Sequence, residues 1–180
     1  MKYALILAGG KSSRMGVDKT LLPYKNYASL THFLFDKLNL IFEDVKIGAK
    51  SDKFSPNLPV LKDEFDDFMP LKVIANLDKH FDEPVFIIAA DTPFVKAGTI
   101  KTLFDNLNGG EISLPSDGEF VHRLCGFYSP KASQKARNLI AGGDFALRSL
   151  NQICATKITK FDKKEQFLNI NTPSDYELIK

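Results

Sequence analysis

Short apolar runs alternate with segments of helical periodicity along the chain. Tyr3–Leu7 and Val85–Ala90 are almost wholly apolar, as expected of strands that a sheet buries on both faces. After Ser29 the apolar residues recur at spacings of three and four, which predicts an amphipathic helix. These residues are Leu30, Phe33, Leu34, Leu38 and Ile41. Strands that alternate with helices predict an α/β fold, in which helices cross over a sheet.

Weaker patterns predict the remaining elements. Shorter strands are expected at Asp44–Gly48, Leu58–Leu61, Ile112–Pro115, Leu124–Tyr128 and Thr156–Phe161. Helices are expected at Thr99–Leu107, Pro130–Ile140 and Phe145–Ile153, and from Pro70 through Leu71, Ile74, Leu77 and Phe81. Near the C-terminus, Thr172, Pro173 and Asp175 have the pattern of a helix start. Because no repeat or linker interrupts 180 residues, we expect a single domain over 1–180.

Composition limits the classes of partner that this protein is expected to bind. The net charge is only +2, which argues against a protein that coats a nucleic acid or a membrane. Cys125 and Cys154 form no CxxC motif and have no histidine directly beside them, so reduced thiols in a cytoplasm are expected. No apolar run approaches the ~20 residues of a membrane span, and the N-terminal run is too short for a signal peptide. We therefore expect a cytoplasmic protein whose partners are small molecules.

A glycine-rich segment follows the first strand directly. It spans residues 7–19 and reads LAGGKSSRMGVDK. Gly9 and Gly10 allow the backbone to approach an anion, and Lys11, Arg14 and Lys19 supply positive charge. Neither the GxGxxG nor the GxxxxGK[ST] phosphate pattern fits this spacing. A surface turn with basic residues is the alternative, and the density of glycines and cations favours phosphate binding over it.

The same segment carries a family resemblance. It resembles the LAGGxSxRMGxDK signature of the molybdenum cofactor guanylyltransferases, and LAGG rather than LAAG favours GTP over CTP. Further segments resemble family motifs in the same order: Val60–Asp63, Asp91–Phe94, Gly143–Asp144 and Asn169–Pro173. The resemblance implies a nucleotide-diphospho-sugar transferase fold, a three-layer α/β/α sandwich around a Rossmann-like, mostly parallel sheet. It also implies transfer of GMP from GTP to molybdopterin with release of pyrophosphate, Mg²⁺ as cofactor, and molybdenum cofactor biosynthesis proteins and molybdoenzymes as protein partners.

The resemblance also implies roles for particular residues. Those expected to bind the substrates are Leu7, Ala8, Gly9, Gly10, Lys19, Asp63, Asp91, Asn169 and Asn171. Lys19, Asp91 and Arg14 are expected to act in catalysis, with Asp91 as the Mg²⁺ ligand. Mg²⁺ needs only one or two carboxylates, because phosphates and water complete its shell. A phosphate acceptor is already charged at neutral pH, so no activated side-chain nucleophile is required.

Structural alternatives stand beside these roles. Asp91 is also placed to cap the turn that follows it, and Asp63 begins an acidic cluster typical of a solvated loop. Asn169 and Asn171 precede a helix start and fit a turn equally well. His122 is either a residue of the acceptor pocket or a structural histidine beside a strand.

Three segments depart from the family pattern. Met69–Val73 stands where the family has Gly-Pro-Leu-Ala-Gly, Ala49–Ser51 lacks an expected Asn, and His122-Arg123-Leu124 replaces His-Pro-Leu. Two competing functions follow from these departures. One is a different small nucleotidyltransferase, acting on cytidylate or on a sugar or polyol phosphate. The other is a non-catalytic nucleotide-binding protein, against which the presence of both Lys19 and Asp91 argues.

Overall fold

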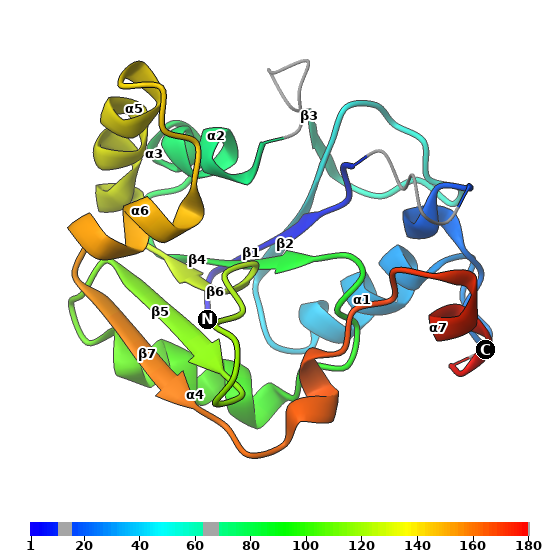
Figure 1. The fold of residues 1–180 in the computed structure, drawn as a ribbon. Helices are drawn as coiled ribbons and strands as arrows, with labels where there is room; N and C mark the ends of the chain where they lie inside the picture. Colours follow the sequence, from blue (N-terminus) through cyan, green and yellow to red (C-terminus); the bar gives the residue numbers. More distant parts are fainter. Residues whose placement is uncertain (11–15, 63–68, 180) are drawn as a thin grey trace.

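The computed structural model describes residues 1–10, 16–62 and 69–179 (Figure 1). In these residues seven strands form one sheet in the order β3-β2-β1-β4-β6-β5-β7. The strands are β1 (Tyr3–Leu7), β2 (Asp44–Ala49), β3 (Val60–Lys62), β4 (Val85–Ala89), β5 (Ile112–Ser116), β6 (Cys125–Tyr128) and β7 (Thr156–Lys160). Only β6 is antiparallel to its neighbours β4 and β5, and every other pair is parallel. The predicted α/β class with a mostly parallel sheet is confirmed.

Helices cover both faces of the sheet (Figure 1). They are α1 (Leu30–Asn39), α2 (Pro70–Ala75), α3 (Leu77–His80), α4 (Ala97–Leu107), α5 (Ser133–Ala141), α6 (Leu147–Ile153) and α7 (Pro173–Glu177). Alternate side chains of β1 face opposite ways. Ala4 and Ile6 join the core with α1 and α4, whereas Leu5 and Leu7 join the core with α2, α3, α5 and α6. This alternation explains the wholly apolar run and builds the expected three layers.

Most predicted elements are present, with shifted ends. The strand expected at Leu58–Leu61 begins only at Val60, because Pro59 before it has no N–H for a sheet ladder. The helix expected from Pro130 begins as a 3-10 turn, and α5 proper starts at Ser133. The helix expected from Phe145 starts at Leu147. In addition, short 3-10 turns that the periodicity does not indicate form at Lys19–Leu21 and Lys164–Phe167.

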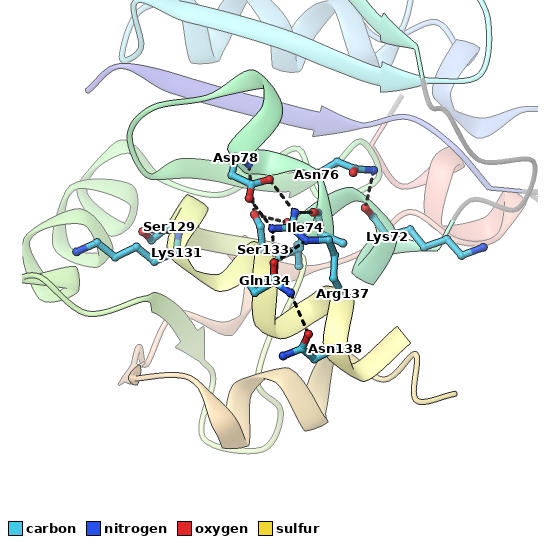
Figure 2. A network of polar contacts seen from close by, with 11 residues as sticks. Lys72, Ile74, Asn76, Asp78, Ser129, Lys131, Ser133, Gln134, Arg137 and Asn138 are labelled. Atoms are coloured by element: carbon cyan, nitrogen blue, oxygen red, sulfur yellow. Dashed lines mark hydrogen bonds and ion pairs between the residues drawn. The ribbon is translucent and has the colours of Figure 1, made fainter. Parts of the chain in front are cut away.

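The single helix expected from Pro70 onward is wrong. The structure has two short helices that meet at Asn76. Figure 2 shows the cause, a serine of α5 that enters the helical ladder. The Ser133 hydroxyl donates to the Ile74 carbonyl at 2.8 Å and accepts from the Asp78 N–H at 3.3 Å, a pair that an unbroken helix would join directly. A side chain inserted in this way breaks the helix.

Arg137 of α5 completes this junction. Its guanidinium donates to the Ala75 carbonyl at 2.6 Å and forms a two-pronged ion pair with Asp78, at 2.9 and 2.7 Å (Figure 2). The hydrogen bonds from Arg137 hold the pKa of Asp78 below its usual value. Side chains of α5 thus satisfy the carbonyls at the end of α2 and hold α2 in place. Pro70, the first residue of α2, lines a cavity described below.

The chain order reverses between β1 and β4. From β1 the chain runs through α1 to β2 and β3, and it then returns to β4 on the other side of β1. Ligands of open α/β sheets bind at such a reversal, beyond the carboxyl ends of the strands. Leu7 and Ala89 are paired there, so the segments that follow them leave the sheet side by side. Within the described residues, no helix has the length and apolarity needed to cross a bilayer.

Gly126 of β6 tests how closely the sheet is packed. A Cβ at this position would lie 2.5 Å from the Ser113 carbonyl oxygen and 2.7 Å from Leu114 Cδ2. We predict that Gly126→Ala lowers the free energy of unfolding by about 1–3 kcal/mol, because strand β5 must move. In the control Gly98→Ala, on α4, a Cβ has nothing within 4 Å. This variant should gain about 0.4–1 kcal/mol. Urea unfolding measures both, and equal stabilities would contradict the prediction.

Candidate functional site

The glycines after β1 begin the site. Leu7 and Ala8 are buried, Gly9 is half-buried and Gly10 is exposed. The Ala8 N–H donates to the Gly48 carbonyl at 2.9 Å, so the chain stays tied to β2 for one residue beyond the strand. Gly10 then has φ +126°, a conformation that side-chain-bearing residues rarely adopt. The glycine is therefore required by the backbone that turns away from the sheet.

Lys19 and Asp91 meet in an ion pair above the carboxyl ends of β1 and β4. The Lys19 ammonium contacts the Asp91 carboxylate and also donates to Asn171 Oδ1 at 2.9 Å. Only 19% of the Lys19 side chain and 13% of the Asp91 side chain are exposed. The Thr92 hydroxyl oxygen lies 3.2 Å from the other Asp91 oxygen, so Asp91 also contacts its own turn. Segments from the start, middle and end of the chain thus converge on one charged cluster.

The C-terminal segment is fastened to the same turn. The Ile170 N–H donates to the Asp91 carbonyl at 2.9 Å, and the Thr92 hydroxyl donates to Asn169 Oδ1 at 2.7 Å. The helix start expected at Thr172 is confirmed, with a capping box formed by Thr172 and Asp175. The cap uses Thr172 and Asp175, whereas the amide oxygens of Asn169 and Asn171 accept hydrogen bonds from Thr92 and Lys19. One pair of side chains in this segment therefore starts the helix, and another pair contributes to the site.

Asp91 stands between two cavities. Ala89, Asp91 and Leu124 line both. The first cavity, of about 180 Å³, is further lined by Leu7, Gly9, Lys19 and Pro70. The second, of about 280 Å³, is further lined by Thr92, His122, Arg123 and Asn169. The glycine segment and the C-terminal motif therefore border different spaces that share one carboxylate.

Lys53 is a site residue that sequence reasoning missed. Its ammonium donates to the Ala8 carbonyl at 3.0 Å and to Asp18 Oδ2 at 2.6 Å. Partial burial raises the pKa of Asp18, but hydrogen bonds from Lys53 and Thr20 outweigh it and leave the pKa below its usual value. Lys53 thus joins the backbone before Gly9 to the residue before Lys19. It is one of many lysines, and only the fold distinguishes it.

The second cavity has a rigid wall. The His122 ring stacks on Phe167, with centroids 4.5 Å apart, and its Nε2 hydrogen-bonds Asp117 Oδ2 at 3.0 Å. His122 thus has structural partners and also lines the second cavity; its role toward an acceptor stays a prediction. Cys125 also lines this cavity, but burial raises the pKa of its thiol to about 12. Cys125 is therefore a neutral wall residue at physiological pH.

Several expected binding residues are not placed in the cavity walls. Lys11, Arg14 and Asp63 fall outside the described residues. Gly10 and Ala8 line neither of the two cavities, and the Ala8 carbonyl accepts a hydrogen bond from Lys53. The Met69–Val73 segment, which differs from the family pattern, includes the start of α2: Met69 precedes the helix and Pro70 is the first residue of the helix.

Comparisons with known proteins show which family this chain resembles. The sequence pattern of the family described as MobA-like NTP transferase domain matches residues 4–156. The chain is 34% identical to the molybdenum cofactor guanylyltransferase of Campylobacter jejuni strain RM1221, over 98% of this chain and 94% of the relative. The enzyme of that name from Helicobacter pylori strain J99 is 33% identical, over 97% and 86% of the two chains.

Solved structures show the same fold. Molybdopterin-guanine dinucleotide biosynthesis protein A from Archaeoglobus fulgidus superposes with a TM-score of 0.81 at 19% identity, covering 99% of this chain and 96% of that one. A protein of Aquifex aeolicus reaches 0.79 at 29% identity, over 95% and 94% of the two chains. The 2-C-methyl-D-erythritol 4-phosphate cytidylyltransferase of Thermus thermophilus reaches 0.72 at 13% identity, covering 99% and 97%. The likenesses at 19% and 13% identity concern the fold alone.

Asp117 gives the wall of the second cavity a pH dependence. Backbone N–H groups of Phe120 and Glu119, and then His122, lower the pKa of Asp117 to about 2. A lowered pKa stabilises the fold above the unfolded pKa of about 4, and this stabilisation is lost as the pH falls toward about 2. We predict that Asp117→Asn is less stable than wild type near pH 7 and that the gap narrows toward pH ~3. Thermal melts across this range, with the exposed Asp105→Asn as control, test it; a gap independent of pH would count against it.

Proposed function

The chain belongs to the MobA-like NTP transferase family, and from that premise we propose that the Asp91 site transfers GMP from GTP to the phosphate of molybdopterin and releases pyrophosphate. The observation that carries this proposal is the position of Asp91 between two cavities. A transferase that joins two substrates needs one space for each, and the groups that stabilise the transferred phosphate must lie where both spaces meet.

The first cavity suits the triphosphate. Gly9 and Lys19 both line it, and a backbone N–H and an ammonium are groups that bind phosphate oxygens. Gly10 follows with the turn that leads the chain away from the sheet. Lys53 fixes the segment on both sides, at Ala8 and at Asp18. Bound phosphates would thus meet groups whose positions the fold has already set, which lowers the entropic cost of binding.

The second cavity suits the acceptor. A phosphate oxygen of molybdopterin attacks the α-phosphorus of GTP, a new P–O bond forms, and the bond to the bridging β-phosphate oxygen breaks, with its electron pair leaving on pyrophosphate. The attacking phosphate is ionised at neutral pH, so no side chain has to remove a proton. Asn169 and Thr92 line this cavity and offer hydrogen-bonding groups to orient the acceptor.

The residues at Asp91 fit a Mg²⁺ ion. Asp91 and Asn171 both direct an oxygen at one cation, the Lys19 ammonium, so the fold already gathers oxygen donors around a positive centre. Among the described residues there is no cluster of three or more acidic, histidine or cysteine side chains that would enclose a metal. A site with the single carboxylate of Asp91 suits Mg²⁺, which takes one or two carboxylates and completes its coordination shell with phosphates and water. The ion would neutralise charge on the α-phosphate and the leaving pyrophosphate.

The curated relatives favour GTP over CTP, because those of C. jejuni and H. pylori are named guanylyltransferases. The paired Lys19 and Asp91 favour a catalytic protein over a passive nucleotide binder. We place the enzyme in the cytoplasm, since Cys125 and Cys154 are free and buried. Molybdenum cofactor biosynthesis proteins and molybdoenzymes are the partners that this reaction would serve.

Asp91→Asn tests the metal-ligand role. The change keeps the size and turn bonding of the side chain but removes the charge that Mg²⁺ needs. We predict that pyrophosphate release with GTP and molybdopterin falls by about 10²-fold or more across a Mg²⁺ titration, while the fold survives. Thermal melts check folding, and the exposed Asp105→Asn on α4 is the matched control. Near-wild-type turnover of Asp91→Asn at saturating Mg²⁺ would rule out the role.

Lys19→Ala tests the triphosphate contact. Loss of one charge-assisted hydrogen bond is expected to weaken binding of a non-hydrolysable GTP analogue by about 1.5–3 kcal/mol, or about 10- to 150-fold. Calorimetric titration with Mg²⁺ present measures the change, and the exposed Lys101→Ala provides the control. If both the GTP affinity and the turnover of Lys19→Ala equal those of the wild type, Lys19 does not contact the triphosphate.

A further inference from the structure

Arg123 stands in the wall of the second cavity and is held there from both ends. Its Nε donates to Asn151 Oδ1 at 3.1 Å, and its Nη1 donates to the Val121 carbonyl at 3.4 Å. Its own carbonyl accepts a 2.6 Å hydrogen bond from the hydroxyl of Tyr128, a fully buried residue of β6. The guanidinium is therefore positioned before any ligand arrives.

All of these partners are neutral. Within residues 1–10, 16–62 and 69–179, no carboxylate lies within ion-pair distance of Arg123. The carboxylates of the same region are engaged elsewhere, Asp91 with Lys19 and Asp117 with His122. By contrast, Arg137 on α5 is paired with Asp78. Arg123 thus places a full positive charge in a cavity wall without an acid to balance it.

A half-buried guanidinium without a counter-ion favours an anionic ligand, because a bound anion compensates its lost hydration. The planar guanidinium also matches the oxygens of a phosphate, with two parallel hydrogen bonds. Charge and geometry therefore both favour a phosphate as the ligand of Arg123.

We infer that Arg123 binds the terminal phosphate monoester of the acceptor in the second cavity. The inference rests on the proposed function and deepens it, since it assigns the acceptor's anion to one residue. Lys19 and Arg123 line different cavities, and in the proposed reaction each binds a different substrate. Two anions that repel each other are thereby each matched with a cation before they meet at Asp91.

Arg123→Met keeps the aliphatic stem and removes the charge. At saturating GTP and Mg²⁺, the KM for molybdopterin in pyrophosphate release should rise by at least about tenfold, and the KM for GTP should stay within about twofold of wild type. Arg123→Lys should recover part of the loss, because it restores the charge without the fork. Arg148→Met, at an exposed position on α6, is the control and should behave as wild type. An unchanged KM for molybdopterin, or an equal rise in both KM values, would overturn the inference.

Inorganic phosphate separates this inference from the proposed function. With a non-hydrolysable GTP analogue and Mg²⁺ occupying the first cavity, phosphate should bind the wild type measurably in calorimetry and bind Arg123→Met at least about tenfold more weakly. If the wild type releases no pyrophosphate with molybdopterin yet binds phosphate through Arg123, only the proposed reaction fails. If turnover is normal and Arg123→Met binds phosphate and acceptor as the wild type does, only the role of Arg123 fails. Thermal melts of each variant exclude unfolding as the cause.

Discussion

The contact of Lys19 with Asp91 and Asn171 joins three parts of the chain that are far apart in sequence. Lys19 comes from the segment after β1, Asp91 from the end of β4, and Asn171 from the approach to the last helix. The backbone bond from Ile170 to the Asp91 carbonyl fixes the C-terminal segment at the same place. Lys19 and Asp91 are largely buried, so each charge depends on the other for stabilisation. The site therefore forms only when all three segments are in place.

The sheet makes this convergence possible. β1 and β4 are adjacent and parallel, with Leu7 opposite Ala89, so their carboxyl ends open into one crevice. The residue before the antiparallel β6, Leu124, accepts a hydrogen bond from the Ala89 N–H at the end of β4 and lines both cavities. In the proposed reaction the two substrates thus meet at one carboxylate, with Lys19 in the wall of one cavity and Arg123 in the wall of the other.

The sequence by itself determined the parts of this protein that depend on neighbours along the chain. The apolar runs predicted β1 and β4 because both faces of these strands are buried. The helix cap at Thr172 could be predicted because its hydrogen bonds join residues within four positions of one another. The glycine segment could be predicted for a similar local reason, since Gly10 adopts a backbone conformation that its lack of a side chain permits. The fold class followed from these local signals and from the family resemblance, and so did five of the residues that line the cavities, namely Leu7, Gly9, Lys19, Asp91 and Asn169.

Only the tertiary structure decided which distant groups would meet. The break at Asn76 comes from Ser133 of another helix, so no helical periodicity in the broken segment could reveal it. Lys53 acquired its role by bridging Ala8 and Asp18, and Arg123 became distinctive because its surroundings supply neutral partners rather than a carboxylate. Such contacts depend on strand order, register and the reach of long side chains. These are set by packing across the whole molecule, and local sequence patterns carry no record of them.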